Sequence, residues 1–354
     1  MNPTPEGASN CLLSIRRLSV RMRPDRRSPW SGHELIQAVE LFDLDVCEGE
    51  SLIVTGETGT GKTVLARTLA GLQVPSAGSV RLGGQEMPAH GHDAATRAWQ
   101  QRIQLVAQSP LAGIAARTKV RTVLERQARH LLPQAGNDER RRRIAGVIPE
   151  AGLVVQELEQ RLHELSPLTQ FRLALARALL SRPRILICDA PGATLEIPEQ
   201  KQVLDLLVRL RHRHGMALVL TALDARPWRG AVDRVVVMYL GRIMEQGGPQ
   251  AVFDTPAHPY TRALLASRVR ITTDRRGVRR AELHVPGDPP NPAHPPIGCV
   301  FHPRCPIVDP ACLRGIPPLR RTGSSPHHYA ACLFAPPTDT DAESLPTPPL
   351  AGHD

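Results

Sequence analysis

Short apolar runs alternate with amphipathic stretches through most of the chain. The apolar runs are rich in branched residues, some with partial alternation, which is typical of strands. The strands predicted in this way span 12–21, 35–46, 51–55, 103–107, 185–188 and 217–221, with a hairpin over 235–245 around Leu240-Gly241. The helical patterns cover 62–72, 171–180 and 200–214, together with most of the charged region 119–164.

This order of elements predicts an α/β fold. Strands that alternate with helices indicate a mainly parallel sheet covered on both faces, and the early cluster of strands indicates an added antiparallel layer. After about Ser267 the composition changes to Pro, Arg and Cys, which marks a different C-terminal region. Residues 336–354 are rich in Pro, Thr and Asp, so we expect a disordered tail there and a flexible start over 1–10.

The composition is that of an ordinary globular protein. Of 354 residues, 41% are hydrophobic and 22% charged, and no apolar run approaches the ~18–20 residues of a membrane span. The start, MNPTPEGASN, is not expected to be a secretory signal. The net charge of +10 is compatible with nucleic acid, but aromatics are only 3%, so stacking platforms are scarce. We interpret the densest basic run, Arg140 to Arg143 after Glu139, as a solvated helix face and expect no nucleic-acid partner.

The most specific motif is a glycine-rich loop between the strand SLIVT and an amphipathic helix. It matches the P-loop pattern of Gly, four residues, Gly-Lys-Ser/Thr. Its residues are Gly56, Glu57, Thr58, Gly59, Thr60, Gly61, Lys62 and Thr63. The glycines let backbone N–H groups curl around a β-phosphate, Lys62 reaches the β- and γ-oxygens, and Thr63 offers its hydroxyl to Mg²⁺. The loop therefore predicts nucleotide binding.

An acidic strand end accompanies this loop. The run Ile185-Leu186-Ile187-Cys188-Asp189 is apolar until its final carboxylate. An aspartate at the carboxyl end of a strand beside a P-loop can hold the Mg²⁺ shell. Such a strand end is a weak signal alone, but with the loop it predicts a nucleotide–Mg²⁺ site.

Further short segments follow in a specific order. They are Gln108 in LVAQSP, His163-Glu164-Leu165-Ser166, Asp189-Ala190-Pro191, Asp233 to Ile243, HPYTRALL at 258–265, and Gly298-Cys299 through Phe301-His302-Pro303-Arg304-Cys305-Pro306. With the P-loop, this order resembles the ATP-binding subunits of ABC transporters, in particular the peptide/nickel importer group. The resemblance runs from about Leu12 to Cys332.

The resemblance implies a fold and a set of ligands. It implies a P-loop (RecA-like) core with an antiparallel layer in 11–267, a helical subdomain at about 110–180, and a cysteine-rich extension over 268–335. ATP would be held by the P-loop with Gln108 and Asp189. Mg²⁺ would be held by Thr63, Gln108 and Asp189, and Ser166 would contact a partner's ATP.

The resemblance also implies partners and a place in the cell. The partners would be a second ATP-binding subunit, two transmembrane permease subunits and, indirectly, an extracytoplasmic solute-binding protein. The chain would then lie at the cytoplasmic face of the cell membrane. The cargo would be a short peptide, or nickel or another metal chelate.

Several positions depart from the family pattern. Ala190 stands where a glutamate would polarise the attacking water, and no histidine follows the strand ALVLT. Pro167 and Leu168 replace the two signature glycines. Proline has no N–H and leucine adds bulk where a partner's γ-phosphate would press in, although Ser166 can still cap the helix. The adenine-stacking aromatic expected near 21–23 is absent, with Trp30 as a candidate substitute.

These departures predict ATP–Mg²⁺ binding with very slow hydrolysis, because losing a positioned base lowers the rate by ~10²–10⁴. Glu196 is another acid nearby in sequence, but it stands where the family has an aspartate for communication between subunits. In a heterodimer, hydrolysis would come mainly from the partner. One alternative is a pseudo-ATPase that uses ATP as a structural ligand in regulation. A soluble ABC ATPase acting on nucleic acid ranks last, because the chain has one P-loop and the HPYTRALL segment.

Four cysteines crowd into the C-terminal region. Without an export signal we expect a reducing compartment, where such a cluster points to metal rather than disulfides. The four are Cys299, Cys305, Cys312 and Cys332. Their spacing fits a structural Zn²⁺ or an iron–sulfur cluster and does not choose between them, and free thiols are the third interpretation. The family resemblance favours a [4Fe–4S] cluster.

Overall fold

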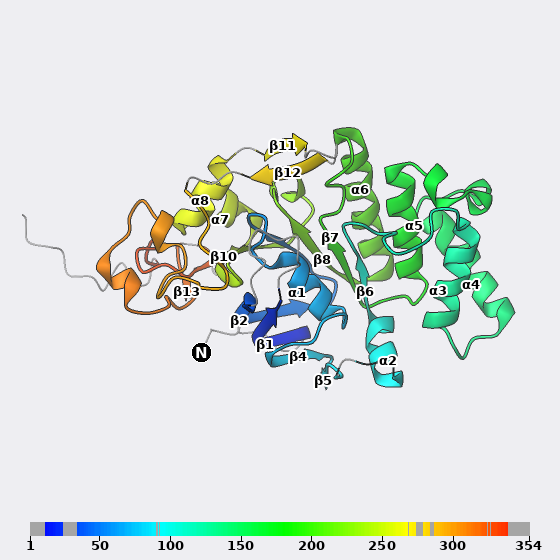
Figure 1. Ribbon diagram of the computed structural model, residues 1–354, viewed down its shortest axis with the longest axis horizontal. Helices are drawn as coiled ribbons and strands as arrows, with labels where there is room; N and C mark the ends of the chain where they lie inside the picture. Colours follow the sequence, from blue (N-terminus) through cyan, green and yellow to red (C-terminus); the bar gives the residue numbers. More distant parts are fainter. Residues whose placement is uncertain are drawn as a thin grey trace, which may run out of the picture.

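A mainly parallel sheet forms the centre of the molecule (Figure 1). The computed structural model describes residues 11–23, 34–89, 91, 93–267, 269–273, 279–283, 287–323, 325 and 327–338. The sheet has the order β13-β14-β10-β9-β3-β8-β7-β6. Its strands are β3 (Ser51–Thr55), β6 (Ile103–Val106), β7 (Ile185–Asp189), β8 (Ala217–Ala222), β9 (Arg234–Tyr239), β10 (Arg242–Gly247), β13 (Arg320–Arg321) and β14 (Tyr329–Ala330). Strands β6, β7, β8, β3 and β9 run parallel to one another. Strands β10, β14 and β13 form an antiparallel edge.

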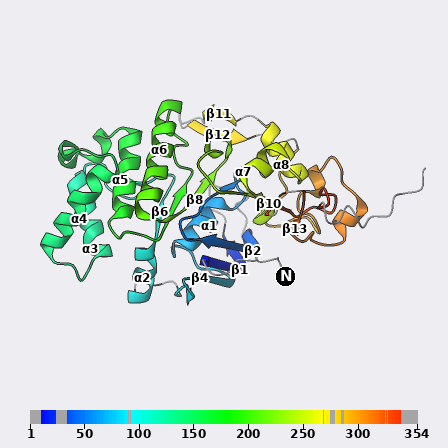
Figure 2. The same cartoon turned by 180° about the vertical axis from the view of Figure 1, so that it is seen from behind.

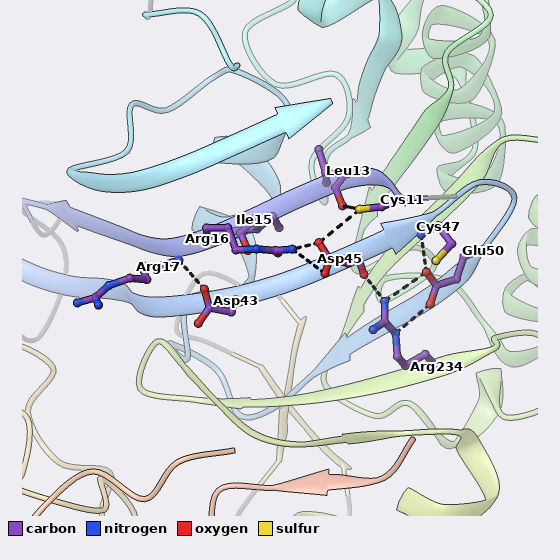
Figure 3. Close-up of polar contacts among 10 residues, drawn as sticks. All are labelled: Cys11, Leu13, Ile15, Arg16, Arg17, Asp43, Asp45, Cys47, Glu50 and Arg234. Atoms are coloured by element: carbon purple, nitrogen blue, oxygen red, sulfur yellow. Dashed lines mark hydrogen bonds and ion pairs between the residues drawn. The ribbon is translucent and has the colours of Figure 1, made fainter. Parts of the chain in front are cut away.

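A second, antiparallel sheet packs on helix α1 (Lys62–Leu69). Its strands are β1 (Cys11–Met22), β2 (Ile36–Cys47), β4 (Ala77–Leu82) and β5 (Gln85–Glu86), in the order β2-β1-β4-β5. Arg16 pairs with Asp45 across β1 and β2 at 2.7 and 2.9 Å (Figure 3). Arg234 at the start of β9 donates to the Asp45 carbonyl and pairs with Glu50 at 2.9 Å, so polar contacts join this layer to the core sheet (Figure 3).

Helices cover both faces of the core, and a helical subdomain lies at the end of the molecule opposite the C-terminal region (Figure 2). It contains α3 (Val120–Leu131), α4 (Asn137–Glu150) and α5 (Pro167–Leu179), while α2 (Ala94–Arg102) and α6 (Ile197–His214) flank the core. Helix α3 buries Val120, Val123 and Leu124 on one face, as a helical period requires. Along α4, Arg141 and Arg142 are exposed, Arg140 and Arg143 are half-buried, and both Arg142 and Arg143 pair with Glu139.

The C-terminal region is built on the edge of the core sheet. Helices α7 (Pro249–Asp254) and α8 (Pro259–Ala266) follow β10, and β11 (Val269–Thr273) pairs with β12 (Arg279–Leu283). Strands β13 and β14 then add to β10. The buried Glu245 carboxylate on β10 contacts the His328 imidazole at 2.7 Å and accepts the N–H groups of Ala257 and His258, both at 2.8 Å. The extension is therefore bonded into the core sheet.

The predicted fold class is confirmed, and the predicted strands and helices of the core recur with shifted ends. The hairpin around Leu240-Gly241 is confirmed by the β9–β10 pairing. Helix α5 begins at Pro167, ahead of the helical pattern over 171–180, because Ser166 caps it as expected from the sequence. Strands β4 and β5, helices α2, α7 and α8, and the short C-terminal strands were not predicted from the hydrophobic pattern. Residues 1–10, Trp30 and the tail from 339 lie outside the described residues.

Candidate functional site

The P-loop joins β3 to α1, and close backbone packing fixes its shape. Gly61 has a φ of +101°, and a Cβ at this position would lie 1.9 Å from the Ala38 carbonyl oxygen. Any side chain there would collide with backbone, so glycine is required. A Cβ on Gly56 would similarly lie 2.1 Å from the Met238 carbonyl oxygen. The loop is therefore held against β2 and β9.

Lys62 lies within this loop and is buried. Its ammonium group donates to the carbonyls of Gly56 and Glu57, both at 2.7 Å, and to the Thr60 hydroxyl at 3.2 Å. Burial lowers the pKa of Lys62 from 10.5 to about 8, although the charges of Asp189 and Glu57 oppose this shift. A phosphate oxygen at the loop would be a charged acceptor in place of these neutral ones.

The acidic strand end is oriented by the neighbouring strand. Asp189 at the end of β7 is 5% exposed and accepts a 2.5 Å hydrogen bond from the Thr221 hydroxyl on β8. The Thr221 hydroxyl in turn accepts from the Ala190 N–H at 3.0 Å. Sequence reasoning noted Thr221 only for the missing histidine, whereas the structure makes it the residue that orients Asp189.

A cleft beside Asp189 brings three sequence-predicted segments together. It is lined by the segment after β6, the turn after β7 and the start of α5, with Gln108, Asp189, Ala190 and Pro167 among the lining residues. Gln108 is exposed, as is Thr63 in the first turn of α1. These oxygen-bearing groups suit a hard cation such as Mg²⁺. The cleft itself lies between Asp189 and the start of α5, and none of the P-loop residues 56–63 lines it.

Comparisons with known proteins identify two family regions, one in the nucleotide-site part of the chain and one in its C-terminal part. Residues 39–193 match the ABC transporter family, and residues 244–312 match the C-terminal region of oligopeptide/dipeptide transporters. The oligopeptide transport ATP-binding protein OppF of Escherichia coli (strain K12) is 34% identical over 95% of this chain and 100% of OppF. The di/tripeptide transport ATP-binding protein DppF of Pseudomonas aeruginosa (strain UCBPP-PA14) is 34% identical over 83% of this chain and 90% of DppF.

The chain belongs to the ATP-binding subunits of oligopeptide/dipeptide ABC transporters.

Solved structures agree on the fold of this ABC subunit. The cbiO1 protein of Clostridium perfringens, part of the ABC transporter complex cbiONQ, has a TM-score of 0.59 at 23% identity and covers 70% of this chain and 92% of its own. The ATP-binding cassette MJ0796, solved as a dimer, has a TM-score of 0.59 at 22% identity, over 67% of this chain and 98% of its own. None of the described helices has the length and apolar character that crossing a bilayer needs.

The residues that depart from the ABC pattern lie at the end of β7 and at the start of α5. Ala190 follows Asp189 with a φ of +49°, and its methyl group can neither accept a proton nor orient water. Ser166 caps α5 by accepting the Thr169 N–H at 3.1 Å, and Pro167 occupies the first helical position, as expected. Leu168 is buried in the apolar core, so its side chain packs inward. The prediction that Leu168 adds bulk where a partner's γ-phosphate would lie is therefore wrong. The loss of one N–H donor at Pro167 is unaffected.

Two further acids lie near the site in sequence, and one of them is already paired. Asp224, beyond the end of β8, forms a two-pronged pair with Arg226, with contacts of 2.7 to 3.0 Å. Glu196 is the N-cap residue of α6, and its N–H donates to the Glu199 carboxylate at 3.3 Å. Neither arrangement supports a replacement for the absent catalytic glutamate.

The four C-terminal cysteines line one small cavity, together with His258 and His302. All four are free thiols. Burial raises the pKa of Cys299 to about 11 and also raises the pKa values of Cys305 and Cys332. Negative charge on the neighbouring cysteines would raise the pKa values of Cys299 and Cys332 further, as expected of thiols that lie close together. Among the described residues, no three His, Cys, Asp or Glu side chains are close enough to hold a single metal ion.

Sequence reasoning did not assign a role to Arg304. This residue precedes Cys305, and its guanidinium reaches the P-loop, where it pairs with Glu57. The HPRC segment that carries the family resemblance thus also contacts the nucleotide site. The pattern alone contained no signal for this contact, because the partners are 247 residues apart.

Proposed function

We propose that this chain binds ATP–Mg²⁺ and serves as one of two ATP-binding subunits of a peptide importer, with little or no hydrolysis of its own. The observation that carries the proposal is a complete phosphate loop beside Ala190. The loop supplies backbone donors and a lysine, which favour binding of phosphates. Ala190 supplies no base, and a positioned base contributes ~10²–10⁴ in rate.

Each ligand group has residues in this chain suited to it. The loop 56–63 would hold the phosphates, with Lys62 as the cation. Thr63, Gln108 and Asp189 would hold Mg²⁺, and the Thr221 hydroxyl keeps one Asp189 oxygen directed. Bound Mg²⁺ would neutralise phosphate charge. We assign this site to an ATP-binding domain over 11–267, followed by the extension 268–335.

The partner contact favours a heterodimer. Ser166 at the start of α5 is exposed, so the helix N-terminus faces outward towards a partner's nucleotide, while the Ser166 hydroxyl bonds to Thr169 within the helix. Pro167 removes one N–H donor from that helix start. A homodimer would repeat the defects at Ala190 and Pro167 in both composite sites. With a partner that has intact motifs, each composite site would carry one defect, and only the site with the partner's catalytic glutamate, which meets Pro167 of this chain, would retain a base for hydrolysis.

Binding and hydrolysis are tested separately. Calorimetry with ATP–Mg²⁺ should detect binding to the full chain and none to Lys62→Ala. Phosphate release from the chain alone should stay near the Lys62→Ala background. Turnover at the rate of an intact ABC subunit, abolished by Lys62→Ala, would contradict the proposal of weak hydrolysis.

We propose short peptides as the cargo, because OppF and DppF are named for peptide transport. Nickel chelates have no corresponding support among these relatives. The chain would dock on two permease subunits at the cytoplasmic face of the membrane, with a solute-binding protein outside. If the chain were instead a regulatory module with ATP as a structural ligand, Lys62→Ala would leave peptide uptake unchanged. Loss of uptake in that variant supports the transport role.

We infer that the four cysteines hold a metal group. A single Zn²⁺ with Zn–S distances of about 2.3 Å needs closely spaced ligands. The four thiols line one cavity, which supports a shared metal group, and the family resemblance favours a [4Fe–4S] cluster over Zn²⁺. The cluster would require deprotonated thiols. Anaerobically purified protein should contain iron and sulfide in equal amounts, and a colourless zinc protein would overturn the assignment.

A further inference from the structure

A buried ion pair joins the C-terminal extension to the P-loop. Arg304 lies in the short helical turn His302–Arg304, and Glu57 is the second residue of the loop. Nη1 and Nη2 of Arg304 donate to the two carboxylate oxygens of Glu57, both at 3.0 Å. The side chains are only 2% and 10% exposed. This is the two-pronged geometry in which arginine binds a carboxylate most strongly.

Aromatic side chains enclose this ion pair. Arg304 Nη1 also donates to the Tyr239 hydroxyl at 3.1 Å, and the guanidinium carbon lies 5.7 Å from the Tyr239 ring centre. Phe301 packs against Tyr239 with ring centres 5.5 Å apart. The pair is therefore shielded from water, which strengthens the attraction between the charges and raises the penalty for leaving either one alone.

The backbone of Glu57 is held from the same side. Its N–H donates to the Tyr260 hydroxyl at 3.0 Å, and its carbonyl accepts from Lys62 at 2.7 Å. Tyr260 belongs to α8 and is fully buried. One loop residue thus connects the extension and α8 to the lysine that would meet the phosphates. A shift of Glu57 would move an acceptor of Lys62.

We propose that Arg304 is a positioning and charge-compensating residue for the nucleotide site, so that the extension sets the affinity for a nucleoside triphosphate. The inference rests on the proposed ATP binding. A carboxylate in a phosphate-binding loop repels the ligand unless a cation offsets its charge. Arg304 supplies that cation and fixes the loop residue that Lys62 contacts. The extension does not need Arg304 for attachment, since β14 and the Glu245–His328 pair already join it to β10.

The test is a double-mutant cycle on the full chain with ATP–Mg²⁺ as the titrant. Arg304→Ala should weaken binding about tenfold or more, within the range typical of coupling between sites. Glu57→Gln added to Arg304→Ala should recover most of that loss, because no uncompensated carboxylate then faces the phosphates. Arg314→Ala removes an exposed arginine of the same extension and is the matched control, with unchanged affinity expected.

A purely structural role would give a different pattern. In that case the double variant would bind no better than Arg304→Ala, and this result would overturn the inference, as would an unchanged affinity of Arg304→Ala. Should Arg304→Ala fail to fold, Arg304→Lys keeps the charge but loses the two-pronged contact, and it should bind more weakly than wild type but fold. If wild type itself binds no ATP, the proposed function fails rather than this inference alone.

Discussion

Raising the pH from about 7 to about 9 should weaken ATP–Mg²⁺ binding by about tenfold. The cause is Lys62, whose pKa is lowered by burial to about 8. The lysine is mostly charged at the lower pH and mostly neutral at the higher one. A bound triphosphate favours the charged form, so binding above about pH 8 must take up a proton. The dissociation constant then scales with 1 + 10^(pH − pKa), which changes by about tenfold, or ~1.4 kcal/mol, over this range.

Calorimetry in buffers of different ionisation enthalpy measures both the affinity and the proton uptake. Lys62→Arg is the control, because a guanidinium stays charged throughout this range. Whatever its absolute affinity, this variant should lose the pH dependence and the proton uptake. An affinity of wild type that is flat between about pH 7 and about pH 9 would refute the reasoning, and so would an equal slope in Lys62→Arg.

Three further predictions concern hydrolysis and stability. Ala190→Glu, paired with an ATP-binding partner whose own catalytic glutamate is replaced by Gln, should raise phosphate release by ~10²–10⁴ over the same pair with Ala190, and no gain would show that a base is not the missing element. Ser166→Ala should lower the free energy of unfolding by about 1 kcal/mol in urea titrations, because the cap of α5 is lost; an unchanged midpoint would contradict this. His328→Ala should lower it by about 3 kcal/mol, because the buried Glu245 carboxylate loses its imidazole partner and keeps only two backbone N–H groups, and a loss below about 1 kcal/mol would mean that the pair is not required.

The P-loop and the core strands could be predicted because their signals are local. Gly56 to Thr63 is one continuous segment, and its glycines and lysine carry the same meaning wherever the loop lies. The apolar runs of β3, β7 and β8 were found because a strand buried on both faces needs consecutive apolar residues. The capping role of Ser166 could also be predicted from a local signal, because capping involves only the first turn of the helix.

The contacts that complete the site were decided by tertiary structure. The Thr221 hydroxyl reaches Asp189 only because β8 lies beside β7, and Arg304 reaches Glu57 only because the extension folds back onto β10. Leu168 turns inward because the apolar core of the helical subdomain lies on that side of α5. The sequence by itself determined the phosphate loop, the main strands and the missing base at Ala190. Sheet order and core packing decided the rest, because both depend on the free energy of contacts between residues far apart in the chain, which no local pattern records.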